Sequence, residues 1–160
     1  NKKNKNHLKM IKIEAFKIIG IETETTNENG QAAIDIGNLW AKFYTENIPN
    51  KILNKLSEDI YAIYTDYESD FKGKYKTIIG LKVDSLQNIP SGLIGREIKT
   101  AEYQKFIAKG TMPNAIGEKW QEIWAKDSII DRKYTADFEV YGKNAQKGEN
   151  SEVEIFIAIK

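Results

Sequence analysis

A carboxylate and a phenol stand two residues apart on one strand-like segment, at Glu139 and Tyr141. Because side chains alternate along a strand, both groups point to the same face. A negative charge beside aromatic rings is suited to binding an organic cation. The same groups could instead act in hydrolysis, with Glu139 as general base on water and Tyr141 or Tyr64 as acid or oxyanion donor. A lone glutamate on such a strand is also common on a solvated face, so three interpretations remain open.

An internal repeat places further aromatic residues near this pair. Residues 40–44 (WAKFY) recur in the second half of the chain as residues 120–124 (WQEIW), with large apolar groups at i, i+3 and i+4. Each segment is followed by a strand-like stretch that ends in a tyrosine, which is Tyr64 in the first half. Ala62 occupies the place that Glu139 takes in the second half. The repeat predicts two similar units, with a carboxylate on one side only of a small-molecule site. Aromatic groups at helical spacing are also typical of plain core packing.

The elements that must position these residues follow the order β-α-β-β in each half. The predicted elements are strands 11–26, 59–67, 75–83, 95–109, 134–142 and 153–160, a helix over 31–47, and a second helix that begins at 110–113 and carries Ile116, Trp120, Ile123 and Trp124. No helix links neighbouring parallel strands in a βαβ rhythm. The pattern therefore predicts an α+β fold, with a mostly antiparallel sheet and helices on one face.

Several predicted strands carry apolar groups on both faces. Residues 153–159 have an unbroken apolar face of valine and isoleucine, and Phe156 and Ala158 lie on the opposite face. Helices can cover only one face, so part of this surface is expected to line a cavity or an interface. Gly20, within the first strand, predicts a bulge or a close approach of two backbones.

The chain is expected to form a single domain over residues 10–160, with halves at about 10–88 and 93–160. The segment 89–92 is the predicted linker between the halves. Residues 1–9 are polar and basic without a period, which is typical of a flexible leader or tag. Met10 would then be a natural start.

Composition argues against several classes of function. The 160 residues carry 24 basic and 23 acidic side chains, a net charge of +1, no cysteine and a single histidine, His7. This balance disfavours direct binding of nucleic acid, which requires a basic face. Thiol chemistry, a metal site and a Ser-His-Asp triad are not expected, and neither a phosphate loop nor another cofactor motif is present. Without a membrane-length apolar run or a signal peptide, the expected location is the cytoplasm.

Three short motifs, in this order and spacing, resemble one known family. They are residues 64–69 (YTDYES), 120–124 (WQEIW) and 134–141 (YTADFEVY). Together they are similar to the GyrI-like effector-binding domain, also called the AraC-type or bacterial transcription activator effector-binding domain, in its stand-alone branch. The likeness covers about residues 10–160. It implies two βαββ units related by a pseudo-twofold axis, with a central ligand groove.

The resemblance also implies roles for particular residues. By position, Glu139 corresponds to the glutamate that meets the charge of cationic, aromatic ligands in multidrug-sensing members, and Tyr141 is its neighbour on the strand. The internal repeat adds Tyr64, Trp40 and Trp120 as walls of the ligand site. The implied function is binding of a cationic, aromatic or amphipathic effector, linked to transcription regulation or drug sensing.

Two alternatives follow from the same resemblance. Some relatives are hydrolases that open strained electrophilic rings with a glutamate and a tyrosine, here Glu139 with Tyr141 or Tyr64. Others inhibit DNA gyrase, which implies a protein-interaction module. No helix-turn-helix is visible in the sequence, so the expected partners are a small molecule and either a DNA-binding regulator or another protein.

Overall fold

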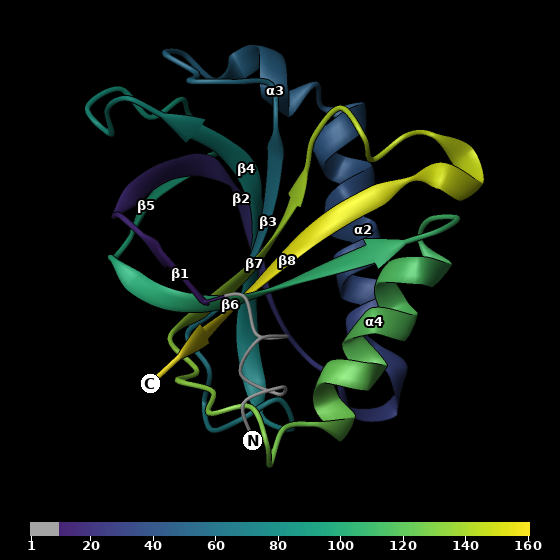
Figure 1. The fold of residues 1–160 in the computed structure, drawn as a ribbon. Coiled ribbons are helices and arrows are strands. Elements are labelled where there is room, and N and C mark those ends of the chain that lie inside the picture. The colour runs from purple at the N-terminus through teal and green to yellow at the C-terminus, as the bar shows by residue number, and fades with distance from the viewer. Residues whose placement is uncertain (1–9) are drawn as a thin grey trace.

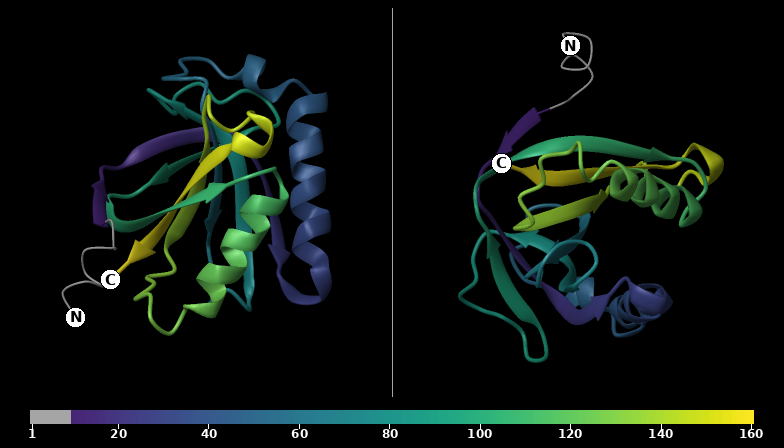
Figure 2. Two further views of the ribbon diagram at one scale, coloured as in Figure 1. Left: turned by 45° about the vertical axis from the view of Figure 1, so that its right-hand side comes forward. Right: turned by 90° about the horizontal axis from the view of Figure 1, so that it is seen from below.

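In the computed structural model, which describes residues 10–160, eight strands form one antiparallel sheet (Figure 1). The strands are β1 (Met10–Ile13), β2 (Phe16–Thr26), β3 (Ile60–Thr65), β4 (Lys74–Val83), β5 (Ile94–Ile98), β6 (Ala101–Lys109), β7 (Ala136–Tyr141) and β8 (Glu152–Ile159). The helices are α2 (Gln31–Thr45), α3 (Ile48–Lys51) and α4 (Asn114–Ala125), with short 3-10 turns at Glu28–Gly30 and Gly148–Asn150. The sheet is strongly curled, and α2 and α4 lie on the same side of it (Figure 2). The predicted α+β class is confirmed.

The order of the strands shows the internal symmetry of the chain. The order is β1-β6-β8-β7-β3-β4-β2-β5. Read from either end, it gives the same succession of equivalent strands if β1 corresponds to β5, β2 to β6, β3 to β7 and β4 to β8. At the centre, β3 pairs with β7, and Ala62 lies opposite Glu139. These two residues are also equivalent in the internal repeat. The pseudo-twofold axis therefore passes between Ala62 and Glu139.

The structure corrects two predicted strands. The segment 11–26 is broken into β1 and β2, and the segment 95–109 is broken into β5 and β6. At each break the chain crosses to the other half of the sheet, because β1 pairs with β6 and β5 pairs with β2. The two breaks meet, since the backbone N–H of Ala15 donates a hydrogen bond to Oγ1 of Thr100 at 2.9 Å. The apolar alternation shifts by one residue at the first break, because Ile11 and Ile13 face the same cluster as Phe16 and Ile18, and the second break shows the same shift. This shift was the signal in the sequence that could have revealed the exchange.

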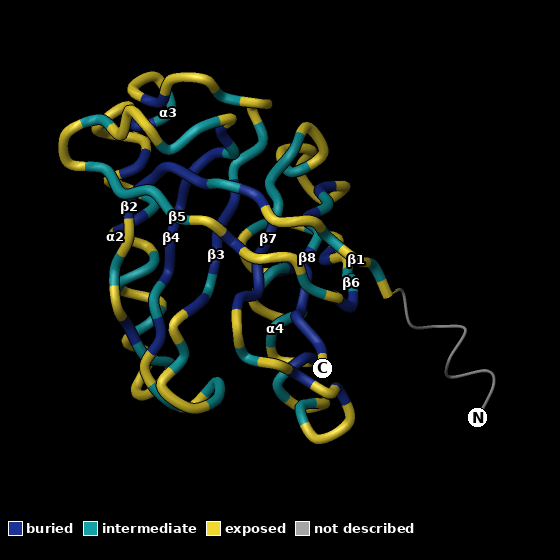
Figure 3. The backbone as a smooth tube through the Cα atoms, turned by 90° about the vertical axis from the view of Figure 1, so that its left-hand side faces the viewer, coloured by how far each residue is buried: buried dark blue, intermediate teal, exposed yellow. Residues whose placement is uncertain are grey.

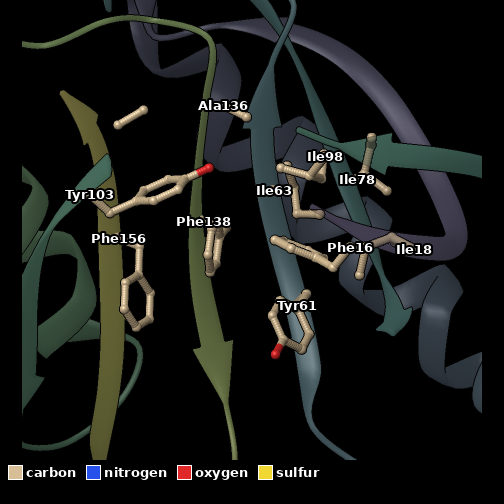
Figure 4. Close-up of a cluster of buried hydrophobic side chains, with 11 residues drawn as sticks. Phe16, Ile18, Tyr61, Ile63, Ile78, Ile98, Tyr103, Ala136, Phe138 and Phe156 are labelled. Atoms are coloured by element: carbon tan, nitrogen blue, oxygen red, sulfur yellow. The ribbon is translucent and has the colours of Figure 1, made fainter. Parts of the chain in front are cut away.

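Both faces of the central strands are buried, as the sequence predicts. On the face away from the helices, a cluster contains Phe16, Ile18, Tyr61, Ile63, Ile78, Ile98, Tyr103, Ala136, Phe138, Phe156 and Ala158 (Figure 4). On the helix face, Leu39 and Phe43 of α2 pack against one half of the sheet, while Ile123 of α4 packs on Ile155 and Ile157 of β8. Buried positions follow the strands, and exposed positions gather in the loops and on the outer sides of the helices (Figure 3). The sheet is thus the core of the molecule.

The close approach expected at Gly20 is confirmed. Gly20 of β2 pairs with Gly80 of β4. A Cβ atom built on Gly20 would stand 2.0 Å from the carbonyl oxygen of Ile79, and one on Gly80 would stand 2.3 Å from that of Ile19. Real Cβ atoms do not come this close to a backbone oxygen, so the path of the two strands here requires glycine on both.

Two expectations fall on residues that the structure does not describe. These are the leader over residues 1–9 and the single histidine, His7, which lie outside residues 10–160. Within residues 10–160, no helix combines the length and the apolar character that crossing a membrane would require.

Candidate functional site

A cavity of about 480 Å³ opens between α2 and α4, over the central strands β3 and β7. This volume is typical of sites that bind drug-sized molecules. Its walls are mainly aromatic and small apolar side chains contributed by both halves of the chain. The lining residues are Asn27, Ala32, Ala33, Ile36, Gly37, Trp40, Tyr64, Tyr67, Phe71, Tyr75, Pro113, Ile116, Gly117, Trp120, Gln121, Trp124, Arg132, Glu139 and Tyr141.

All five residues selected from the sequence line this one cavity. Glu139 and Tyr141 come from β7, Tyr64 from β3, Trp40 from α2 and Trp120 from α4. The strand positions share the helix face because they alternate with residues of the core on the opposite face. The structure therefore brings the whole predicted set together, from four elements that are distant in the sequence.

Glu139 lies at the centre of the set and is only 2% exposed. Its Oε2 accepts hydrogen bonds from the hydroxyl of Tyr64 at 2.8 Å and from the indole N–H of Trp120 at 2.6 Å. Its Oε1 accepts one from the hydroxyl of Tyr141 at 2.7 Å. The carboxylate is thus held by three neutral donors, two on one oxygen and one on the other.

Burial controls the protonation of this group. It raises the pKa of Glu139 above the ordinary value for a glutamate, and the three hydrogen bonds oppose this rise without cancelling it. Burial, with the adjacent carboxylate, also raises the pKa of Tyr64 and of Tyr141 well above the usual range for a phenol. Both tyrosines therefore remain hydrogen-bond donors at neutral pH.

The aromatic surroundings of Glu139 follow the pseudo-twofold axis. Tyr64 and Tyr141 are equivalent, and each meets the tryptophan of the facing helix edge to face. The ring centroids lie 5.4 Å apart for Tyr64 and Trp120, and 5.0 Å apart for Tyr141 and Trp40. The polar groups break this symmetry. The carboxylate of Glu139 accepts hydrogen bonds from both tyrosines, whereas the equivalent position on β3 carries only the methyl group of Ala62.

A second buried polar group was not selected from the sequence. Arg132, in the segment before β7, lines the cavity and is 5% exposed. Its Nη2 donates to Oδ2 of Asp137 at 2.7 Å, and its guanidinium lies 4.1 Å from the ring centroid of Tyr134. Burial alone would lower the pKa of Arg132, but Asp137, Tyr67 and Tyr134 together outweigh it and the pKa is raised. Residues from a connecting segment carry no periodic signal, so sequence patterns could not place Arg132 here.

Phe71 is a further lining residue that periodicity could not reveal. It lies in the turn between β3 and β4, and its ring stacks on Trp124 of α4 at 5.9 Å with an angle of 8° between the planes. The side-chain amide of Asn27 donates to the backbone carbonyl of Phe71 at 2.9 Å, which holds this turn at the edge of the cavity.

Two glycines of the lining did carry a signal in the sequence. Gly37 and Gly117 each stand three residues before the tryptophan of their helix, and both lie inside a helix, where glycine costs about 1 kcal/mol relative to alanine. A Cβ atom on either would meet nothing within 4 Å. The repeated glycine thus leaves open space along both helices. Its recurrence three residues before Trp40 and before Trp120 is the sequence pattern that could have identified both glycines as lining residues.

A curled sheet of two βαββ units around an aromatic cavity is the architecture of an effector-binding protein. Comparison of the chain with known proteins leads to the same class. The chain is 28% identical over 125 residues to YobU of Bacillus subtilis, a candidate transcriptional regulator, covering 76% of this chain and 78% of that protein. It is 32% identical to the integron cassette protein VCH_CASS2 from the mobile metagenome of Vibrio cholerae. That crystal structure has a TM-score of 0.75, over 96% of this chain and 95% of the other. The structure of SAV2435 bound to tetraphenylphosphonium has the same fold, with a TM-score of 0.79, 22% identity, and coverage of 96% and 94%.

The family follows from a match over nearly the whole chain. Residues 9–159 match the family described as Cass2, integron-associated effector binding protein. The chain belongs to this family, and the resemblance to effector-binding domains that its motifs indicated is confirmed.

Proposed function

We propose that the protein binds an aromatic or amphipathic organic cation in the cavity between α2 and α4, with Glu139 as the counter-charge. One observation carries this proposal. Glu139 is 2% exposed, and all three of its hydrogen-bond donors are neutral groups. A buried carboxylate with neutral partners is poorly solvated, and a cation that enters the cavity relieves that cost.

The walls of the cavity suit the rest of such a ligand. The rings of Tyr64, Tyr141, Trp40 and Trp120 offer π-faces and edges on both sides of the carboxylate, and tyrosine and tryptophan attract cations through their faces. Charge and flat apolar area are recognised without many directed hydrogen bonds, so ligands of varied outline can be accepted. This breadth is what a multidrug sensor requires. The presence of tetraphenylphosphonium in SAV2435, a protein of the same fold, supports the choice of ligand class.

The test is a titration followed by tryptophan fluorescence, because Trp40, Trp120 and Trp124 all line the cavity. Tetraphenylphosphonium is the cationic probe, and triphenylphosphine oxide is a neutral control of similar shape. Saturable quenching is expected with the cation and much weaker quenching with the neutral compound.

The variant Glu139→Gln keeps the size and hydrogen-bonding capacity of the side chain but removes its charge. It is expected to weaken the binding of the cation by at least about 2 kcal/mol, roughly 30-fold. Glu118→Gln, on the exposed surface of α4, is the matched control and is expected to bind as the wild type does. Equal affinity in the Glu139→Gln protein, or equal affinity for the neutral compound, would contradict the proposal.

We also propose that binding of a ligand in the cavity changes transcription through a partner protein. The likeness to YobU, a candidate transcriptional regulator, supports this role, and the net charge of +1 disfavours direct contact with DNA. The test is a transcript profile of cells with the wild-type or the Glu139→Gln gene, with and without tetraphenylphosphonium. A response to the cation that depends on Glu139 would support the role, and an identical response in both strains would refute it.

A further inference from the structure

The sheet side of the cavity continues past Tyr64 at the end of β3 but stops at Tyr141 at the end of β7. The segment after β3 and the start of β4 add further lining residues. The equivalent segment after β7, residues 142–151, lies wholly within the part of the chain that the structure describes and adds none. Four rings form this one-sided extension, and we call them the aromatic arm: Tyr67, Phe71 and Tyr75, with Trp124 of α4 stacked on Phe71.

The two halves of the sheet differ here in the size of one residue. Tyr75 stands four residues before the β4 residue that pairs with Ala62. Ser151 stands four residues before the β8 residue that pairs with Glu139. Because Ala62 and Glu139 are equivalent positions, Tyr75 and Ser151 are equivalent too. The hydroxyl of Ser151 donates to the backbone carbonyl of Gly148 in its own loop, at 2.8 Å, so this half offers no ring where the other half has Tyr75.

The aromatic arm continues the ring surface that begins beside Glu139. The ring centroid of Tyr75 lies 6.1 Å from that of Tyr64 and 5.7 Å from that of Tyr67. On the helix side, the centroid of Trp124 lies 6.4 Å from that of Trp120. A ligand whose charge meets the carboxylate can therefore keep ring contacts along the whole arm.

The polar groups of the arm are already paired within the protein. The hydroxyl of Tyr67 donates to Oδ2 of Asp137 at 2.5 Å, and that of Tyr75 donates to Oδ1 of Asn27 at 2.5 Å. The amide of Asn27 in turn holds the backbone of Phe71. The arm thus presents mainly ring carbon, which favours an uncharged aromatic group. The same bonds fix the rings in place, and this lowers the entropic cost of binding.

The strand register sets the length of a ligand that would fill the arm. Tyr64 is two residues beyond Ala62, which pairs with Glu139, and Tyr75 is two residues beyond Thr77, which pairs with Tyr64. These steps correspond to about 7 Å and about 13 Å along the strands. The second ring of a linear biaryl falls within this range when the charge at its other end lies at Glu139.

We propose that the aromatic arm binds the distal ring of an elongated aromatic cation, whose charge stands at one end of a linear biaryl. This inference rests on the proposed function and narrows its ligand class from aromatic cations in general to linear ones with a terminal charge. The preference follows because a bent cation of equal size cannot reach the arm and loses the ring contacts and apolar burial there.

The test compares two isomeric cations by calorimetry. In (4-phenylbenzyl)trimethylammonium the two rings and the charge lie in a line. In (2-phenylbenzyl)trimethylammonium the same atoms and charge are present, but the second ring is folded beside the charge. The wild-type protein is expected to bind the linear isomer about tenfold more tightly, as the added aromatic contacts imply.

Variants on the two sides of Glu139 locate the effect. Phe71→Ala removes one ring of the arm and is expected to weaken the binding of the linear isomer about fivefold without changing that of the bent isomer. Phe71→Leu, which keeps most of the apolar volume, is expected to lie between this variant and the wild type. Tyr44→Ala is the matched control, because Tyr44 is 55% exposed and stacks on Trp40, which meets Tyr141 on the other side. It is expected to keep the preference of the wild type.

The outcomes separate this inference from the proposed function. Equal affinities of the wild type for the two isomers, or binding of tetraphenylphosphonium but of neither isomer, would overturn the inference and leave cation binding intact. A preference for the linear isomer that persists in Phe71→Ala, or an equal loss for both isomers in that variant, would also overturn it. Binding of these cations that Glu139→Gln does not weaken would refute the proposed function and the inference with it.

Discussion

Removing one hydroxyl group beside Glu139 should destabilise the protein in a way that depends on pH. The change is Tyr64→Phe or Tyr141→Phe, which keeps each ring and deletes one hydrogen bond to the buried carboxylate. A hydrogen bond to a charged group contributes about 1.5–3 kcal/mol, and one to a neutral group about 0.5–1.5 kcal/mol. The free energy of unfolding should therefore fall by about 1.5–3 kcal/mol where Glu139 is ionised, and by less where it is protonated.

The structure also predicts which tyrosine contributes more to the free energy of unfolding. Oε2 of Glu139 keeps the indole N–H of Trp120 at 2.6 Å when Tyr64 is replaced. Tyr141 is the sole donor to Oε1 among the residues described, so its replacement leaves that oxygen unpaired. Tyr141→Phe should thus be the more destabilising variant. For a domain of this length, 1.5–3 kcal/mol corresponds to a decrease in Tm of about 3–12 °C.

The direction of the pH effect follows from the pKa of Glu139. Burial raises this pKa above the value in the unfolded chain, so the folded state binds more protons between the two values. The contribution of Glu139 to stability is then fully present below the unfolded pKa and is lost as pH rises through the folded pKa. Losing a donor raises the folded pKa further, so the deficit of each phenylalanine variant should grow as pH rises.

The assay is urea unfolding of the wild type and the variants across the acidic and neutral range, with Tyr103→Phe as the control. Tyr103 is 1% exposed in the cluster on the opposite face, and it does not contact Glu139. A double-mutant cycle between Tyr64→Phe and Glu139→Gln measures the coupling directly. Deficits of equal size at low and neutral pH, or additive effects in the cycle, would show that the tyrosines do not stabilise the ionised carboxylate.

Three further changes test the backbone and the site. Gly80→Ala should lower the free energy of unfolding by about 1–3 kcal/mol or more, because the methyl group would stand 2.3 Å from a carbonyl oxygen. Gly117→Ala should instead raise the free energy of unfolding by up to about 1 kcal/mol, because the methyl group would meet nothing within 4 Å. Thermal unfolding of both variants and the wild type measures the two effects. The affinity for tetraphenylphosphonium should fall as pH drops through the raised pKa of Glu139, since a protonated carboxyl offers no charge, whereas Glu139→Gln should bind equally weakly at every pH. A flat pH profile in the wild type would argue against Glu139 as the counter-charge.

Local patterns in the sequence predicted the two long helices, most of the strands and several of the residues that line the cavity. Helical spacing placed Trp40 and Trp120 on helices, and alternation placed Glu139 and Tyr141 on one face of a strand. The internal repeat added Tyr64. The side chains could be assigned to these faces because periods of 3.6 and 2 residues reflect which side chains face the sheet, and this depends on the local backbone alone.

Only the tertiary structure decided how the halves combine. The breaks after β1 and β5 shift the apolar alternation by one residue, but which strands pair across them depends on the path of the curled sheet. The pairing of Ala62 with Glu139 depends on the register between β3 and β7, and it places a single carboxylate on the pseudo-twofold axis. Arg132 and Phe71 reach the cavity from connecting segments, whose course is set by long-range contacts with no period in the sequence. The sequence by itself therefore determined which groups face the cavity from helices and strands, whereas the convergence of three donors on Glu139 and the place of Arg132 and Phe71 in the cavity wall required the folded chain.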